Sequence, residues 1–197
     1  MKTSIFRLTS LLAGLLASTG LLAEGPRSPS MLANTCAGCH GTNGASAGDA
    51  MPTIGGLDKR YLANVLGQFK SGARDSTIMG RIMKGYSDDE IKAIADHMAS
   101  QTWVPTVAKV DPKLAQQGSK IHNDAKCETC HEKNGQVQDA ETPRVAGQWP
   151  DYTYNMLVIY HDVGAPASQP RKMRERVQKL SLDELKAVAH FYAAQDK

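Results

Sequence analysis

The pentapeptide C-x-x-C-H occurs twice in the sequence, as Cys36-Ala37-Gly38-Cys39-His40 and as Cys127-Glu128-Thr129-Cys130-His131. Two thiols at this spacing lie on one helical turn, so each can form a thioether to a vinyl group of the same porphyrin. The histidine that follows can then place an imidazole nitrogen on the iron. All 4 cysteines of the chain belong to these motifs. The sequence therefore predicts two covalently attached haem c groups.

Two other kinds of site use paired cysteines. Two C-x-x-C pairs could ligate a structural zinc ion, and a single pair could form a thiol–disulfide centre. Neither alternative explains a histidine directly after both pairs. A thioredoxin-like centre also needs a βαβ context, and the sequence shows little strand-like alternation. We therefore favour haem attachment at both motifs.

The two halves of the sequence are copies of one unit. A shift of 91 residues places Cys36 on Cys127 and also aligns several residues that follow, namely Asn43-Gly44 with Asn134-Gly135, Pro52 with Pro143 and Tyr61 with Tyr152. Further on the shift becomes 94 residues, which places Ser87 on Ser181. Such an internal repeat predicts a tandem of two single-haem domains.

The first 23 residues have the composition of a secretory signal peptide. Lys2 and Arg7 form a positive start, and residues 8–22 are rich in Leu and Ala. This apolar run is shorter than the roughly 20 residues that a membrane-spanning helix needs, which disfavours an uncleaved anchor. We expect cleavage after Ala23 and a periplasmic mature chain without a membrane span.

Helix signals divide the mature chain into residues 24–102, a linker at 103–111 and residues 112–197. Asp111 and Pro112 form a typical helix start. Asp58 is a candidate N-cap for a helix through Phe69, and its counterpart is expected from about Pro150 to Tyr160. The closing helices begin with capping boxes, Ser87 with Glu90 and Ser181 with Glu184. Both halves are therefore expected to be all-α.

The sixth ligand of each iron is expected to be a methionine, which is common beside histidine in electron carriers. Met79 precedes Ser87 by 8 residues, and Met173 precedes Ser181 by the same interval. The alternative for both is an ordinary core methionine, and His161 is the fallback ligand for the second iron. The other histidines have no counterpart in the opposite half and are mostly expected at the surface or at helix caps; these are His97, His122 and His190.

An iron with both axial positions filled has no open site for a substrate. The sequence also lacks a Ser-His-Asp order, a phosphate-binding glycine loop and a dinucleotide fingerprint. The formal net charge of +3 falls to +1 without Lys2 and Arg7, which gives no indication of a nucleic-acid partner. The chain is therefore expected to transfer electrons, with no catalytic residue of its own.

The segment around Met79 resembles a known family. The run Gln68-Phe69-Lys70-Ser71-Gly72 and the stretch from Ser76 to Ser87 are similar to the dihaem cytochrome subunit of flavocytochrome c sulfide dehydrogenase. The first haem motif and Ala146-Gly147-Gln148-Trp149 also fit that family. The segment 162–170 departs from its pattern.

This resemblance implies two class I cytochrome c domains, each enclosing one covalent haem. It implies Cys36, Cys39, His40 and Met79 as the residues of the first haem. It implies Cys127, Cys130, His131 and Met173 for the second. It further implies a separate FAD-bearing subunit that oxidises sulfide, a heterodimer with this chain, and a soluble cytochrome c-type acceptor. This chain would then be the non-catalytic electron-transfer subunit of a sulfide:cytochrome c oxidoreductase.

Two other functions fit the same residues. A free-standing dihaem cytochrome c that delivers electrons to a terminal oxidase shares the tandem arrangement and the distal methionines. An electron-transfer subunit of another periplasmic dehydrogenase is also compatible. A neighbouring gene for a flavoprotein with two dinucleotide-binding domains would favour the sulfide dehydrogenase.

Overall fold

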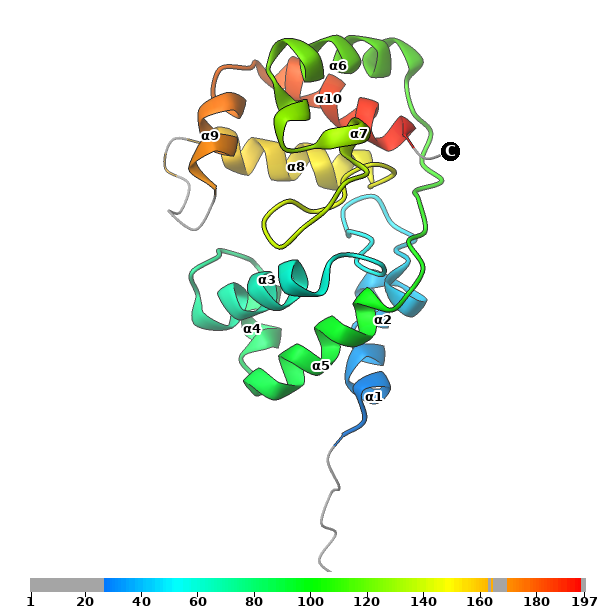
Figure 1. Ribbon diagram of the computed structural model, residues 1–197, viewed down its shortest axis with the longest axis vertical. Coiled ribbons are helices and arrows are strands. Elements are labelled where there is room, and N and C mark those ends of the chain that lie inside the picture. Colours follow the sequence, from blue (N-terminus) through cyan, green and yellow to red (C-terminus); the bar gives the residue numbers. More distant parts are fainter. Residues whose placement is uncertain (1–26, 163, 165–169, 196–197) are drawn as a thin grey trace, which may run out of the picture.

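The computed structural model describes residues 27–162, 164 and 170–195, which form helices joined by loops with no strand among them (Figure 1). This confirms the all-α prediction. The proposed leader at residues 1–23 lies outside the described part of the chain.

Each half contributes one set of helices. The first half contains α1 (Pro29–Asn34), α2 (Ala37–His40), α3 (Lys59–Ser71), α4 (Met79–Met83) and α5 (Asp88–Ala99). The second half contains α6 (Pro112–Asp124), α7 (Glu132–Gly135), α8 (Pro150–His161), α9 (Arg171–Val177) and α10 (Leu182–Ala194). A 3₁₀ turn at Thr42–Gly44 follows the first motif, and another at Cys127–Thr129 opens the second. The expected linker runs without helix between the halves.

The helices begin where the capping residues predict. The Asp58 carboxylate accepts hydrogen bonds from the backbone at the start of α3, and Asp111 does the same for α6. Both capping boxes form, with Ser87 opening α5 and Ser181 opening α10. These contacts satisfy backbone N–H groups that have no partner inside the helix. The α3 and α8 helices each extend slightly beyond the expected end.

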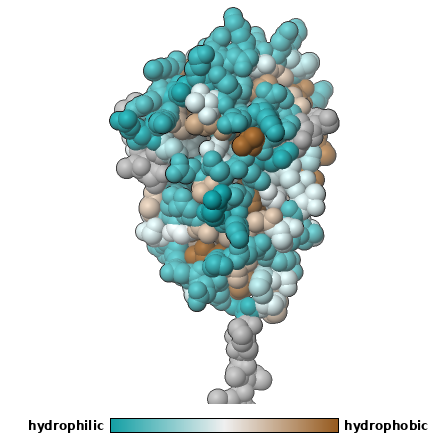
Figure 2. Space-filling view, in the orientation of Figure 1, coloured by the Kyte–Doolittle hydropathy of each residue, from teal (hydrophilic) through white to brown (hydrophobic). Residues whose placement is uncertain are grey.

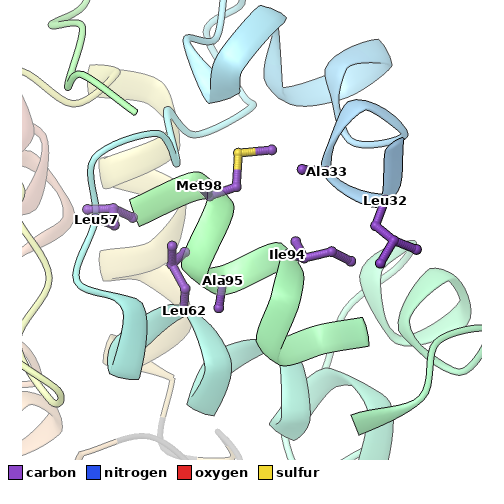
Figure 3. Close-up of a cluster of buried hydrophobic side chains, with 7 residues drawn as sticks. All are labelled: Leu32, Ala33, Leu57, Leu62, Ile94, Ala95 and Met98. Atoms are coloured by element: carbon purple, nitrogen blue, oxygen red, sulfur yellow. The ribbon is translucent and has the colours of Figure 1, made fainter. Parts of the chain in front are cut away.

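A compact apolar cluster joins α1, α3 and α5 in the first half (Figure 3). Leu32 of α1 and Ile94 of α5 are each 2% exposed and lie toward one another across the cluster. Leu62 of α3 and Met98 of α5 belong to the same cluster. Cys36 packs against the edge of this cluster. The first attachment motif is therefore fixed to the core of its half.

The second half has its own core between α6, α8 and α10. Leu157 of α8 packs with Leu185, Val188 and Phe191 of α10. Gly118 lets α6 approach α10 closely, because a Cβ there would lie only 2.1 Å from the carbonyl oxygen of Ala187. Each half thus buries a separate hydrophobic core, as expected for two domains.

The two halves also contact each other directly. In Figure 1 the second half lies above the first, with α8 and the loop before it facing α3. The Trp149 side-chain N–H donates to the Ser46 carbonyl at 3.2 Å, and the Tyr152 backbone N–H donates to the Asp49 carbonyl at 2.9 Å. These bonds tie the start of α8 to the loop of the first half that precedes α3.

The face shown in Figure 2 is mostly hydrophilic, with small separate apolar areas. Within the described ranges, none of the helices combines the length and the apolar character that crossing a membrane requires.

Candidate haem sites

The first motif forms one tight turn that gathers its three chemical groups. The His40 backbone N–H donates to the Cys36 carbonyl at 2.9 Å, and that of Cys39 donates to the same oxygen at 3.2 Å. Cys36 is half-buried and Cys39 is exposed, and both thiols are free. The turn therefore places the two cysteines and the histidine on one short stretch of backbone, the spacing that attachment to one porphyrin requires.

The His40 ring is oriented by the backbone of the same half. It is 8% exposed, and its Nδ1 lies 2.9 Å from the Pro52 carbonyl oxygen. Since a carbonyl only accepts, Nδ1 must carry the proton, which leaves the Nε2 lone pair free for a metal. Burial lowers the pKa of His40, so the ring is neutral at neutral pH, as a ligand must be.

The second motif repeats this turn with a different local backbone. His131 N–H donates to the Cys127 carbonyl at 2.9 Å. Lys126, just before the motif, has a positive φ of 60°. Burial lowers the pKa of His131 to about 4, which keeps this imidazole neutral too. Its Nδ1 is buried, and among the described residues it has no hydrogen-bond partner. The histidines of the two motifs are therefore held differently.

The thiols do not resemble those of a redox-active C-x-x-C site. Burial raises the pKa of Cys36, and it raises that of Cys127 to about 11. Thiol–disulfide exchange needs the opposite change, because the thiolate is the reactive form. Within the described ranges, no three His, Cys, Asp or Glu side chains gather as a metal-ion cluster of the kind a zinc alternative needs. Thiols and neutral imidazoles on one turn fit haem c instead.

The candidate distal residues lie on equivalent helices of the two halves. Met79 is the first residue of α4 and is half-buried. Met173 lies in α9 and packs against the second core. In Figure 1, α4 and α9 lie on the same side of the molecule, each toward the left of the motif helices α2 and α7. Thioethers in these positions suit a sixth ligand, and ligation by them remains a prediction.

His122 differs from its expected place at the surface or a cap. It is 2% exposed, and its Nδ1 lies 3.0 Å from the Tyr192 hydroxyl. The Tyr192 ring in turn lies 5.8 Å from the His131 ring, centroid to centroid. His122 therefore lies behind His131 of the second motif, with Tyr192 between them. The position of His122 on α6 was only a weak indication of its burial, because its hydrogen-bond partner Tyr192 lies 70 residues away in the sequence.

The remaining histidines lie outside the motifs. His190 accepts a hydrogen bond from the Asp111 backbone N–H at 3.2 Å, so it supports the start of α6. His97 and His161 are half-buried near the ends of α5 and α8. Among the residues that the structure describes, no contact assigns His161 to the second site.

The comparisons with known proteins agree with this geometry. The cytochrome c sequence family matches residues 29–102. Cytochrome c4 of Stutzerimonas stutzeri is 31% identical over 144 residues, which are 64% of this chain and 68% of that protein. The chain belongs to the cytochrome c family. The crystal structure of reduced recombinant cytochrome c4 from Pseudomonas stutzeri matches with a TM-score of 0.75 and 26% identity, over 86% of this chain and all of that one.

Two further relatives are named for sulfur chemistry. The cytochrome subunit of sulfide dehydrogenase from Chlorobaculum tepidum is 44% identical over 70 residues, or 36% of this chain and 63% of that protein. The thiosulfate dehydrogenase electron acceptor of Stutzerimonas stutzeri is 29% identical over 184 residues, or 88% of this chain and 83% of that protein.

These findings support the tandem of two class I cytochrome c domains and an electron-transfer function. A bound haem c supplies a one-electron change of its iron. The thiols and neutral imidazoles of the two motifs are the groups that would hold it.

Proposed function

We propose that this protein is the dihaem subunit that accepts electrons from an FAD-containing sulfide dehydrogenase and passes them to a soluble periplasmic cytochrome c-type acceptor. The observation that carries the proposal is the exposed apolar face beside Met79, in the segment with the family-like sequence. The 44% identity to the Chlorobaculum tepidum subunit supports it. The flavin would be bound by the partner, and this chain would perform no bond chemistry itself.

The proposal assigns one haem to each half. Cys36 and Cys39 would attach the first haem, with His40 and Met79 as axial ligands. The second haem would use the equivalent set, which is Cys127, Cys130, His131 and Met173. The corresponding domains would be residues 24–102 and 112–197, joined by the linker 103–111, with residues 1–23 removed on export to the periplasm.

The entry point for electrons would be the α4 face. Ile78 is 50% exposed and Ile82 is 42% exposed on either side of Met79. Exposed apolar side chains next to a redox ligand favour close contact with a partner protein. Arg81 and Lys84 are exposed on the same segment and would add charge recognition. If the partner docked here, electrons would have a short path to the first haem.

A free-standing electron shuttle is the second candidate. The similarity to cytochrome c4 extends over both halves, with 28% identity to the Pseudomonas aeruginosa protein over 93% of each chain. The strong match to the sulfide dehydrogenase subunit covers a much smaller part of the chain. A shuttle of this kind would bind its donor and acceptor in turn, without a permanent flavoprotein subunit.

The first test is the visible spectrum of the protein purified natively from its source, recorded before and after sulfide is added. Co-purifying flavin and rapid haem reduction by sulfide are expected. Haem that is reduced by ascorbate but not by sulfide, even with the flavoprotein added back, would overturn the proposal and support the shuttle. A parallel sample with thiosulfate and its dehydrogenase distinguishes the other sulfur donor.

A charge-reversal pair tests the docking face. Arg81→Glu is expected to weaken flavoprotein binding and slow flavin-to-haem transfer. Lys172→Glu makes the same change on the exposed part of α9, beside Met173, and should leave both unchanged. Equal effects of the two variants, or none from Arg81→Glu, would contradict entry at α4.

A further inference from the structure

A hydrogen bond between two buried rings links the helices of the second core. Tyr192 of α10 is 4% exposed, and its hydroxyl lies 3.0 Å from Nδ1 of His122 on α6. The two rings meet edge to face, with centroids 5.6 Å apart and an interplanar angle of 88°. The two helices lie against each other in the upper half of Figure 1. The bond therefore fixes the direction of the Tyr192 ring from a second helix.

Both partners of this bond are uncharged. Burial lowers the pKa of His122, and this effect exceeds the opposing effect of the Glu128 carboxylate. Burial also raises the pKa of Tyr192 well above its ordinary value. The imidazole and the phenol are therefore neutral at neutral pH, and each satisfies the other. Loss of either would leave a buried polar group without its partner, which makes the pair a fixed part of the core.

The Tyr192 ring also packs against the second motif. Its centroid lies 5.8 Å from that of the His131 ring, at an interplanar angle of 60°. A Cβ on Gly135 would lie 3.0 Å from Cδ1 and from Cε1 of Tyr192. The Gly135 backbone N–H donates to the His131 carbonyl at 3.0 Å, so both residues belong to one turn. The tyrosine ring thus lies against the imidazole and against the turn that carries it.

The first half has no such pair. The shift of 94 residues places Met98 at the position of Tyr192, and the shift of 91 places Met31 at the position of His122. Met98 is 3% exposed and belongs to the first core, whereas Met31 is 61% exposed. Two thioethers cannot form a bond between a hydroxyl and an imidazole, because neither carries a donor. The pair is therefore specific to the second half.

The two motif histidines differ in the same way as their surroundings. Nδ1 of His40 lies 2.9 Å from the Pro52 carbonyl oxygen. Pro143 is the equivalent proline of the second half, yet the buried Nδ1 of His131 has no hydrogen-bond partner among the described residues. The half that lacks the bond to a proline carbonyl is the half in which a tyrosine ring packs against the imidazole. The tyrosine therefore accounts for the difference.

We propose that Tyr192, held by His122, is a positioning residue that sets the ring orientation of His131 and keeps its Nδ1 from the Pro143 carbonyl. The inference rests on the proposed function, in which His131 is a ligand of the second haem iron. A ligating imidazole whose other nitrogen donates to a carbonyl is the more basic ligand and stabilises the oxidised iron. The pair thus raises the second potential above the value that a bonded His131 would give.

The test is a redox titration of the full, haem-loaded protein, together with electron paramagnetic resonance of the oxidised form. Tyr192→Met and His122→Met each install the residue of the first half, and Tyr192→Phe removes only the hydroxyl. All are compared in a Met79→Ala background, in which loss of the thioether lowers the first step and leaves the second identifiable. Tyr86→Phe is the matched control, since its hydroxyl forms a bond of 2.7 Å with Thr35 Oγ1 in the first half.

Tyr192→Met is expected to lower the second midpoint potential and to change the principal g-values of the second haem, because the imidazole can turn toward the carbonyl. Tyr192→Phe and His122→Met should each give a smaller change in the same direction. Their combination should add little, because both remove the same hydrogen bond. Tyr86→Phe should leave the second haem unchanged. A second haem that Tyr192→Met leaves unchanged, or changes no more than Tyr86→Phe does, would overturn the inference.

A crystal structure of the wild-type holoprotein covers variants that fail to mature. Nδ1 of His131 beyond hydrogen-bonding distance of the Pro143 carbonyl, with the Tyr192 hydroxyl on His122, would support the inference. Nδ1 bonded to that carbonyl would overturn it. A wild-type chain without haem at the second motif overturns the proposed function as well, whereas two haems with an unmoved second potential overturn this inference alone.

Discussion

The side-chain amide of Gln148 pairs with both backbone groups of Thr53 across the contact between the halves. The Thr53 N–H donates to Oε1 at 3.0 Å, and Nε2 donates to the Thr53 carbonyl at 2.9 Å. Gln148 is 3% exposed and Thr53 is 1% exposed. A second glutamine, Gln138, bonds in the same manner to the Gly56 carbonyl and the Asp58 N–H. The loop before α8 thus completes the backbone hydrogen bonding of the loop before α3.

Replacing Gln148 with Leu should uncouple the halves. The substitution leaves the buried N–H and C=O of Thr53 without partners, and each such group costs roughly 1–3 kcal/mol. We expect a lower free energy of unfolding in denaturant titrations of the haem-loaded protein, with separate transitions for the two halves. Gln178→Leu on an exposed residue after α9 is the control. Identical, coincident transitions in both variants would contradict the coupling.

Gly118→Ala should destabilise the second half strongly. Its Cβ would lie 2.1 Å from the Ala187 carbonyl oxygen and 2.7 Å from the Phe191 Cβ, so α6 and α10 would have to separate. Loss of packing on this scale costs about 1–3 kcal/mol or more. Gly67→Ala is the matched change in α3, where no atom lies within 4 Å of the added Cβ. It should be neutral or stabilising by helix propensity. Equal thermal midpoints for the two variants would refute the close contact.

The carboxylates that cap the helices should make the free energy of unfolding depend on pH in the acidic range. Backbone N–H donors at Leu114 and Lys113 lower the pKa of Asp111, and those at Ser181 lower the pKa of Glu184. Since the folded-state pKa lies below the unfolded value, this stabilisation is present above pH about 4 and is lost as the pH falls through the folded pKa.

Asp111→Asn and Glu184→Gln should therefore flatten the decline in unfolding free energy at acid pH, measured by denaturant titration across that range. Asp162→Asn, just beyond the end of α8, is the control. A slope unchanged from that of the wild type would contradict this role for the caps.

The two haems should differ in potential because their proximal histidines are held differently. The Nδ1–H of His40 donates to the Pro52 carbonyl, whereas Nδ1 of His131 has no partner among the described residues. Such a bond makes the imidazole a stronger ligand and stabilises the oxidised iron. We expect the second haem to have the higher potential. Electrons entering at the first half would then move energetically downhill.

Met79→Ala identifies the two steps in a redox titration. Removal of the thioether should lower the first potential markedly and leave the second step near its wild-type value. The retained step should be the higher of the two wild-type steps. Retention of the lower step would contradict the assignment of potentials, and two unchanged steps would remove Met79 as a ligand.

Features that depend on neighbouring residues were predictable from the sequence. The caps at Asp58, Ser87 and Ser181 are satisfied within a few residues, and each C-x-x-C-H group is gathered by a single turn. The repeat then predicted two similar helical halves. Met79 and Met173 were selected by position alone, so their ligation stays a prediction.

Features that depend on how the halves meet were not predictable. Thr53 and Gln148 are 95 residues apart, and nothing local in either segment indicates the pairing. The burial of His122 against Tyr192 also requires the tertiary arrangement. The repeat implies that matching residues of the two halves have the same surroundings. It therefore gives no indication of the residues whose surroundings differ because the halves contact each other.

The most direct test of the account is mass spectrometry of the intact protein purified from its native periplasm, followed by proteolytic mapping. Two haem adducts per chain are predicted, one on the peptide with Cys36 and Cys39 and one on the peptide with Cys127 and Cys130. A chain with a single adduct, or with free or disulfide-bonded cysteines in either motif, would contradict the assignment of one haem to each half.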